Sequence, residues 1–260
     1  MFADTLIEKL KNSQHLVILT GAGVSAESGI ATFRDALTGL WKNHDAETLA
    51  SKQRFRADPA LVWGWYEWRR NQVLQAKPNP AHDAIAQLAK QIPNVTLITQ
   101  NVDDLHERAG SQNVLHLHGS LHQPRCLVCD QPYNLPEPAL SIEIVNVESR
   151  IDPPRCLDCD GPIRPGVVWF GEQLPVIAWK FAQEACRQCD FMLVIGTSGV
   201  VWPVADLPNL VNKKRAYVVQ INPTITSLNA VATYNLVGKA GEILPKLYNY
   251  LLSHRVHLYL

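Results

Sequence analysis

Short apolar runs recur along the chain, and each ends in small or polar residues. Five runs share this design: HLVILTGAG (15–23), NVTLITQNVD (94–103), NVLHLHGS (113–120), FMLVIGTS (191–198) and AYVVQIN (216–222). Runs of this length without regular polar alternation are typical of parallel strands that are buried on both faces. We therefore expect one parallel sheet whose carboxyl edge collects the polar residues.

Helical patterns separate some of these runs. Apolar residues recur at helical spacing in AHDAIAQLAKQ (81–91) and AWKFAQEACRQC (178–189). Strands that alternate with helices predict an α/β fold built on a doubly wound, Rossmann-like parallel sheet. Ligands bind such sheets at the carboxyl ends of the strands, so the polar ends of the runs are the candidate site.

Two segments interrupt this alternation. Residues 36–80 are polar and rich in Trp, with a predicted helix from Pro59 to about Gln75, and residues 121–165 are rich in Pro and Cys. We expect them to form a smaller domain, a helical module plus a cysteine ribbon, beside the sheet. The sheet domain would then comprise residues 1–35, 81–120 and 166–260.

The charge balance narrows the possible partners. The chain has 24 Lys and Arg and 24 Asp and Glu, so its net charge is zero. Proteins that coat nucleic acid or bind anionic lipid need a basic excess, so both classes are excluded. No apolar stretch reaches the ~18 residues of a membrane span. The segment MFADTLIEKLKNSQ lacks the basic-then-apolar build of a signal peptide, and we expect a cytoplasmic protein.

The cysteines fall in pairs, which indicates metal or redox chemistry. Four of them form a C-x-x-C…C-x-x-C pattern: Cys126, Cys129, Cys156 and Cys159. Four thiolates suit a tetrahedral zinc ion, and such a closed site has no open position for catalysis. The surrounding segment is poor in apolar residues, which favours one structural zinc over redox pairs. The third pair, Cys186 and Cys189, is expected to be two small buried residues at a helix end.

The segment GAGVSAESGIATFRD (21–35) follows the first apolar run. A strand, a glycine turn and a helix start would expose amide N–H groups to a phosphate, and Gly21 and Gly23 would let the backbone approach a pyrophosphate. A tight turn without a ligand explains the glycines equally well. Ala26 stands where dinucleotide folds have a third glycine. No strand with a ribose-binding acid follows about twenty residues later, so the loop is not that of an ordinary dehydrogenase.

Six motifs occur in the order and spacing of the sirtuins: GAGVSAESGIATFRD, TQNVDDLHERAG, LHLHGS, VVWFGE, IGTS and VVQIN. Over roughly residues 15 to 250 the chain resembles that family of NAD-dependent protein lysine deacylases. The resemblance implies an enzyme that consumes NAD without hydride transfer and gives nicotinamide, O-acyl-ADP-ribose and free lysine. The implied partners are acyl-lysine proteins or peptides, without nucleic acid or membrane.

The resemblance also changes how the histidines are interpreted. By residue type alone, His118 suits a structural role as well as that of a base. In sirtuins the histidine of the LHGS motif deprotonates a ribose hydroxyl of NAD after the acyl oxygen has displaced nicotinamide, and a neutral imidazole can do this. His118 and Asn101 are therefore the implied catalytic residues. His82, His106 and His122 are expected to be structural or surface residues.

The implied contacts with NAD follow from the same motifs. The glycine turn would hold the phosphates, Phe33 would shield the ribose from water, and the QNVD loop would bracket the ribose and the nicotinamide amide, although such a loop is ordinary at a strand end. The implied NAD contacts are Gly21, Ala22, Gly23, Ala26, Phe33, Arg34, Gln100, Asn101, Asp103, Gly196, Thr197, Ser198, Asn222 and Ala240. The VVWFGE backbone would pair with an extended acyl-lysine peptide, at Val168, Phe170, Gly171 and Glu172.

Tyr66 and Arg69 are three residues apart on the predicted helix and share a face. They could belong to a Trp/Tyr core stripe with a solvated arginine. Tyr-x-x-Arg at this point also resembles the sirtuin subclass that removes succinyl and malonyl groups, where an arginine and a phenol bind the distal carboxylate. We therefore predict desuccinylase and demalonylase activity with some deacetylase activity, and a pocket widened near Ala36. The alternatives are a plain deacetylase, an NAD glycohydrolase or ADP-ribosyltransferase, and a non-enzymatic zinc-ribbon adaptor.

Overall fold

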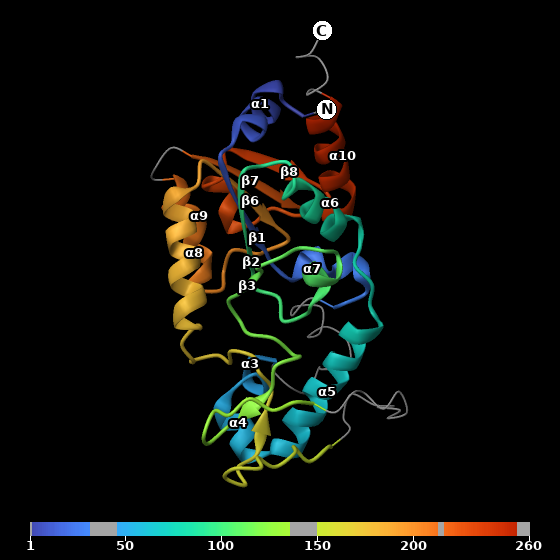
Figure 1. The fold of residues 1–260 in the computed structure, drawn as a ribbon, viewed down its shortest axis with the longest axis vertical. Coiled ribbons are helices and arrows are strands. Elements are labelled where there is room, and N and C mark those ends of the chain that lie inside the picture. The colour runs from blue at the N-terminus through green and yellow to red at the C-terminus, as the bar shows by residue number, and fades with distance from the viewer. Residues whose placement is uncertain (1, 32–45, 136–149, 213–215, 254–260) are drawn as a thin grey trace.

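The computed structural model describes residues 2–31, 46–135, 150–212 and 216–253. Along its long axis the molecule has a larger part, which holds the central sheet, and a smaller part with short helices and a two-stranded ribbon (Figure 1). None of the helices in these described ranges has the length and apolar character needed to cross a bilayer.

The central sheet has six parallel strands in the order β3-β2-β1-β6-β7-β8. These strands are β1 (His15–Thr20), β2 (Asn94–Thr99), β3 (Leu115–His116), β6 (Phe191–Ile195), β7 (Tyr217–Asn222) and β8 (Tyr234–Val237). The strand order reverses between β1 and β6, as it does in doubly wound dinucleotide-binding folds. This confirms the predicted fold class. The five predicted strands are present, and β8 is an edge strand that the apolar runs did not predict.

Helices cover both faces of the sheet (Figure 1). One face packs on side chains of α1, α6 and α10, among them Leu10, Ile85 and Leu247. The other face packs on α8 and α9, where Cys186 and Cys189 are buried as expected. The bounds of the elements in the larger part are α1 (Asp4–Asn12), α6 (Pro80–Leu88), α7 (Leu105–Arg108), α8 (Val176–Gln188), η3 (Val204–Asp206), α9 (Leu207–Asn212), η4 (Ser227–Ala230) and α10 (Ala240–Ser253).

The smaller part has its own apolar core. Its elements are α3 (Ala46–Leu49), α4 (Lys52–Ala57), α5 (Pro59–Gln75), and the antiparallel strands β4 (Arg125–Cys126) and β5 (Ile163–Arg164). Phe55 of α4 packs on Trp169, with ring centroids 5.3 Å apart, and Trp65 and Leu121 belong to the same cluster. Residues from both predicted insertions therefore share one core. The two-domain division at the predicted boundaries stays a proposal, and Trp169 of this core lies beyond the boundary at residue 165.

Candidate active site

The glycine turn after β1 packs directly against the turn after β6. The N–H of Gly23 donates to the carbonyl of Gly196 over 2.8 Å, and a Cβ on Gly23 would lie 2.7 Å from that oxygen. Gly196 has a φ of +61°, and a Cβ there would lie 2.5 Å from the amide nitrogen of Val24. The glycines therefore permit close contact between the two turns at the point where the strand order reverses. Their contact with phosphate stays a prediction.

The segment after the turn differs from the predicted helix start. Two short 3₁₀ turns follow, η1 (Ala22–Val24) and η2 (Ala26–Ser28), and Gly29 ends them with a φ of +83°. Ala22 and Ala26 each begin one of these turns. Phe33 and Arg34, implied NAD contacts, lie outside the described residues, as does Ala36.

Polar side chains from three strand ends meet beside this turn. Asn101, after β2, donates from Nδ2 to Oγ of Ser25 over 3.1 Å, and Ser25 donates to Oδ2 of Asp103 over 3.0 Å. Gln100 donates from Nε2 to Oγ1 of Thr197, after β6, over 3.0 Å. Burial raises the pKa of Asp103, although hydrogen bonds from Leu105 N–H and Ser25 partly oppose the rise. Asn101 and Asp103 therefore meet at Ser25 in one buried network, while Gln100 pairs separately with Thr197.

His118 presents a free ring nitrogen at the same edge. Its Nδ1 lies 3.0 Å from the carbonyl oxygen of Gln100. A carbonyl only accepts, so Nδ1 carries the hydrogen and Nε2 holds the lone pair. Within the described residues Nε2 has no hydrogen-bond partner. Burial lowers the pKa of His118 below its usual value, which keeps the ring neutral at physiological pH. The side chain is thus set up to accept a proton.

Ser25 and His82 also belong to the network, and neither was a predicted site residue. The N–H of Asn79 donates to Nδ1 of His82, so Nε2 carries a hydrogen and points to Oγ of Ser25 over 3.4 Å. Burial lowers the pKa of His82 to about 4 and that of His106 to about 3. Both rings are therefore neutral, as expected of structural histidines. Nothing in the sequence links Ser25 to a histidine 57 residues away.

The residues predicted for the adenosine half lie at the same edge of the sheet. Thr197 and Ser198 follow β6, and Asn222 ends β7 and donates from Nδ2 to the carbonyl of Thr197 over 2.9 Å. Ala240 is buried at the start of α10, where the next N–H, of Gly241, donates to Glu27 over 2.7 Å. The edge can therefore offer hydrogen-bonding groups along the length of a dinucleotide.

Tyr66 and Arg69 form a second cluster on α5. Tyr66 is buried, and its hydroxyl accepts from Nε1–H of Trp169 over 3.1 Å, so its own hydrogen remains available to a ligand. Burial raises the pKa of Tyr66 to about 12. The guanidinium of Arg69 lies over the ring of Trp65 at 5.0 Å, and burial lowers its pKa. No ion pair joins Arg69 to a carboxylate of the described residues, because the nearby Glu67 pairs with Arg70 instead.

Segment 167–172 lies between His118 and the smaller part. The N–H of Val168 donates to the carbonyl of His118 over 2.8 Å, and that of Phe170 donates to the carbonyl of Ala50 over 3.0 Å. Glu172 accepts from the N–H of Trp169 over 2.9 Å, and its own N–H donates to the Trp169 carbonyl. The carbonyls of Val167 and Trp169 also accept hydrogen bonds, from Arg164 and from the Glu172 N–H.

Glu172 itself is held by a buried cation. Both guanidinium nitrogens of Arg164 contact its carboxylate, over 2.5 and 2.8 Å. Burial alone would raise the pKa of Glu172, but Arg164 and the Trp169 N–H outweigh it and lower the pKa. The Glu172 side chain is therefore a structural anchor of the segment.

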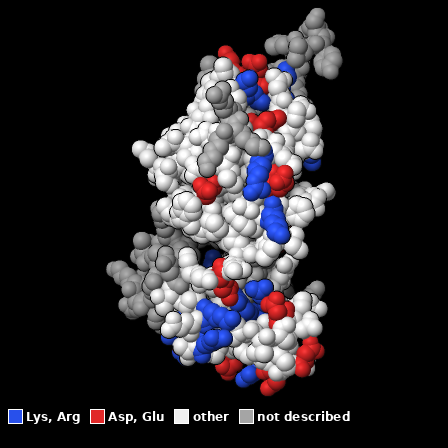
Figure 2. Space-filling model, turned by 90° about the vertical axis from the view of Figure 1, so that its left-hand side faces the viewer, with Lys and Arg blue, Asp and Glu red and all other residues white. Residues whose placement is uncertain are grey.

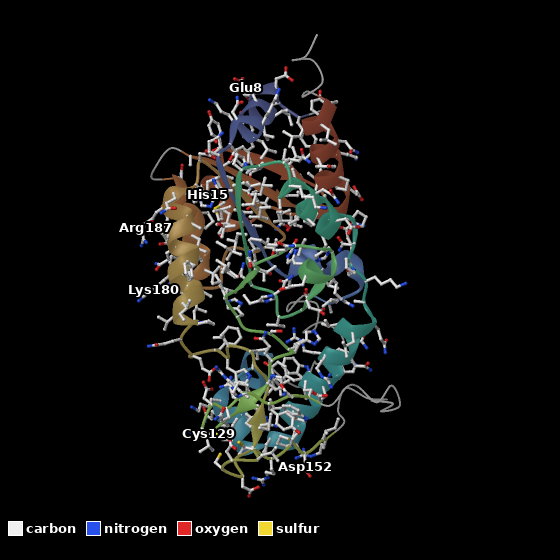
Figure 3. All side chains as sticks on the ribbon, viewed as in Figure 1. Glu8, His15, Cys129, Asp152, Lys180 and Arg187 are labelled. Carbon is white, nitrogen blue, oxygen red and sulfur yellow. The ribbon has the colours of Figure 1, made fainter. Side chains whose placement is uncertain are left out.

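The four paired cysteines gather at one point of the smaller part. Their sulfur atoms all lie within 4.8 Å of one another, and three of the Sγ–Sγ distances are 3.4, 3.5 and 3.6 Å. A tetrahedral ion with bonds of ~2.3 Å separates its sulfur ligands by about 3.8 Å, so the cluster can hold one zinc ion. Cys129 lies at the end of the molecule remote from the sheet (Figure 3). A metal there is structural, as predicted.

One face of the molecule has a hollow and a mixed distribution of charge. On the face seen in Figure 2, the molecule is hollowed between its larger and smaller parts, and basic and acidic side chains are interspersed.

Known proteins match this chain over nearly its whole length. The chain is 59% identical over 246 residues to the NAD-dependent protein deacylase of Methylococcus capsulatus, and the match covers 95% of this chain and 96% of the relative. A crystal structure of a Sir2 homologue–NAD complex has a TM-score of 0.88 at 44% identity and covers 98% of this chain and 95% of that one. A structure of Sir2 with a p53 peptide and NAD+ has a TM-score of 0.81 at 32% identity, covering 96% and 98%. Because the Sir2 family pattern also matches residues 21–203, the chain belongs to the Sir2 family.

Proposed function

We propose that this protein is an NAD-dependent protein lysine deacylase. The observation that carries the proposal is a neutral His118 whose Nε2 has no partner within the described residues, beside a buried network at the edge where the strand order reverses. NAD supplies the ADP-ribosyl group that takes the acyl group from lysine, water completes the transfer, and the products are nicotinamide, O-acyl-ADP-ribose and free lysine. The relative from Methylococcus capsulatus, named as such a deacylase, supports the assignment.

Each polar group of the site has a role in this reaction. His118 accepts a proton at Nε2 from a ribose hydroxyl, while its Nδ1–H stays on the carbonyl of Gln100. Asp103 can accept from an amide NH₂ such as that of nicotinamide. Asn101 is fixed by Ser25 and acts beside the reacting ribose. The edges of β6 and β7, with Thr197 and Asn222, would hold the adenosine half.

We also propose that the enzyme prefers acidic acyl groups, succinyl and malonyl above acetyl. A buried cation without a carboxylate partner is unfavourable unless a ligand completes the pair. Arg69 is partly buried and makes no ion pair within the described residues, although the charge of Asp103 attracts it, and Tyr66 can donate its hydroxyl hydrogen beside it. The distal carboxylate of a succinyl-lysine would accept from both. An acetyl group would leave the guanidinium without that partner.

The substrate is proposed to be an extended acyl-lysine peptide along segment 167–172. Within the described residues, no backbone hydrogen bond engages the carbonyl of Val168 or the N–H of Gly171, so both are available for strand-like pairing. Such backbone contacts tolerate many sequences, and the structure with a p53 peptide supports a peptide substrate. Thiolate ligands for zinc persist where thiols stay reduced, which favours a cytoplasmic location.

The test is product analysis by mass spectrometry, with NAD and one peptide carrying succinyl-, malonyl- or acetyl-lysine. A deacylase gives free lysine and O-acyl-ADP-ribose in equal amounts. NAD consumption that does not depend on an acylated peptide would instead indicate a glycohydrolase or ADP-ribosyltransferase.

Paired variants test the acyl preference. Arg69→Met should lower kcat/KM for the succinyl peptide by about 10- to 150-fold, since a hydrogen bond to a charged group contributes ~1.5–3 kcal/mol. Turnover of the acetyl peptide should change little. Arg70→Met is the matched control, because Arg70 is bound to Glu67 over 2.6 Å and is not part of the cluster. Unchanged succinyl turnover in Arg69→Met would leave a plain deacetylase as the assignment.

A further inference from the structure

Two histidines on one strand face hold consecutive carbonyl groups. His116 in β3 and His118 just after it are two residues apart, so their side chains point to the same side. Nδ1 of His118 lies 3.0 Å from the carbonyl oxygen of Gln100, and Nδ1 of His116 lies 3.1 Å from that of Asn101. Both Nδ1 atoms therefore carry a hydrogen. Together the two rings fix the loop that follows β2.

The two rings differ at their other nitrogen. Nε2 of His118 has no partner within the described residues, whereas Nε2 of His116 lies 2.7 Å from Oε1 of Glu107 on α7. A carbonyl and a carboxylate both accept, so only the doubly protonated imidazolium satisfies both contacts of His116. The structure therefore contains one neutral and one cationic histidine on the same strand face.

The charges around His116 agree with this geometry. Burial alone would lower the pKa of His116, but the Glu107 carboxylate, the Asn101 carbonyl and the charge of Asp103 together raise it. His106, also on α7, faces this group, and its own low pKa of about 3 keeps it neutral. The acidic groups are thus the neighbours that decide the charge of His116.

Asn101 is held at three points. Its N–H donates to Oγ1 of Thr99 over 3.0 Å, its side chain donates to Ser25 over 3.1 Å, and its carbonyl accepts from His116. Of these three contacts, the one to His116 is made by a group that titrates near neutral pH. The protonation of His116 therefore controls one of the contacts that orient Asn101.

We propose that His116 and Glu107 form a clamp that positions Asn101 for the acyl-transfer reaction. The proposal rests on the proposed function, and His116 acts as a positioning residue. When His116 loses a proton, the remaining hydrogen stays on Nε2 beside the Glu107 carboxylate. The lone pair of Nδ1 then faces the Asn101 carbonyl, and the clamp opens. Activity should fall as the pH rises above the ordinary titration range of histidine.

Two substitutions of His116 separate positioning from packing. In His116→Asn the amide nitrogen stands near the place of Nδ1 and can still donate to the Asn101 carbonyl. In His116→Gln the amide reaches toward Glu107 instead. We expect kcat of His116→Gln to fall by about 10- to 100-fold, since small misplacements at a reacting centre have effects of this size. His116→Asn should keep most of kcat. Equal loss in both variants would overturn the proposal.

Glu107→Gln tests the charge dependence. The amide can donate to Nε2 of a neutral His116, which leaves the Nδ1 hydrogen on the Asn101 carbonyl. The alkaline decline of kcat expected of the wild type should therefore weaken or vanish in Glu107→Gln. Glu184→Gln, on α8 in an exposed pair with Arg187, is the matched control and should keep the wild-type pH profile. An alkaline decline that is identical in Glu107→Gln and the wild type would overturn the clamp.

An NMR titration separates this inference from the proposed function. The amide nitrogen of Val102 shares its peptide group with the Asn101 carbonyl, so its ¹⁵N shift reports on that hydrogen bond. In the wild type the shift should follow the titration of the His116 ring, and in Glu107→Gln it should not. If the wild type turned over no acyl peptide, the proposed function would fail. The Val102 ¹⁵N shift would still show whether His116 and Glu107 hold the Asn101 carbonyl. A Val102 shift indifferent to His116 would refute it.

Discussion

Glu172→Gln is the perturbation whose effect can be worked out most fully. Glu172 joins the proposed peptide segment to Arg164, a cation with 4% of its side chain exposed. Arg164 contacts both carboxylate oxygens, donates to the carbonyl of Val167 over 2.8 Å and lies 3.5 Å from the centroid of Trp169. The substitution keeps the size of the side chain and removes its charge. Arg164 is then left buried without a counter-ion.

The expected loss follows from this burial. Removing one partner of a buried ion pair destabilises a protein by about 3–5 kcal/mol, since the other charge stays desolvated. The Glu172 side chain is 20% exposed, so water can partly replace it, and we expect the low end of the range. A loss of about 3 kcal/mol corresponds to a fall in Tm of about 6–12 °C for a chain of this size.

Urea unfolding at pH 7 measures the effect as a lower midpoint with an unchanged slope. Glu184→Gln is the control, because its exposed pair with Arg187 should contribute less than ~1 kcal/mol. Arg164→Met combined with Glu172→Gln should recover much of the loss, since neither charge is then unpaired. If the effects of the two single variants simply added in the double variant, the reasoning would be refuted.

Four further outcomes are expected. The folded protein lowers the pKa of Glu172, so this side chain should stabilise the fold at any pH above its pKa in the unfolded chain. The contribution should be lost as the pH falls through its pKa in the folded protein, and urea unfolding at a series of acidic pH values would detect the loss. Because His118 acts when neutral and burial lowers its pKa, kcat/KM should fall in acid with a midpoint below 6.5, and a midpoint at or above 6.5 would contradict the assigned cause. Gly196→Ala should lower the free energy of unfolding by more than about 2 kcal/mol and should weaken NAD binding measured by calorimetry. Gly29 also has a positive φ, but a Cβ there would meet no neighbouring atom, so Gly29→Ala should lower the free energy of unfolding by only about 1–2 kcal/mol. Metal analysis should give one zinc ion per chain. A Cys129→Ser variant or a chelator should lower Tm, since without a cation the neighbouring thiolates repel one another.

The sheet could be predicted because its central strands are buried on both faces. β1 and β6 are enclosed almost from end to end, so each is a continuous apolar run. β8 is an edge strand with alternating partial exposure, and its four residues have no such run. The cysteine cluster was also predictable, because its chemistry depends on residue type and spacing alone. These features share one property: a short stretch of sequence contains their physical cause.

The polar network could be predicted only in part. Its predicted members, Asn101 and Asp103, stand together after one strand. Ser25 and His82 join them through a turn after β1 and the start of α6, and Asn79 fixes which nitrogen of His82 carries the hydrogen. Such a network depends on distances between elements that are far apart in the chain. Periodicity and spacing contain no information on those distances.

Arg164, which is buried, and Arg69, which is partly buried, show that the sequence does not determine which charges are paired. Arg164 and Arg69 both lie against aromatic rings, over Trp169 and Trp65. Arg164 has a carboxylate in contact with both of its terminal nitrogens, and that pair has a structural role. Arg69 has an acidic residue two positions before it, but positions two apart do not face each other on a helix.

That acidic residue, Glu67, instead binds Arg70, three positions after it. Arg69 is therefore left with aromatic neighbours and, within the described residues, with no ion pair, although the charge of Asp103 attracts it at longer range. A partly buried cation without an ion pair costs some stability, and a ligand carboxylate would reduce that cost. An acidic acyl group would supply it, so Arg69→Met should raise the thermal stability of the unliganded protein while it removes the succinyl preference. A lower Tm in Arg69→Met would show that Arg69 contributes to the core, and it would remove the physical basis for an acidic substrate.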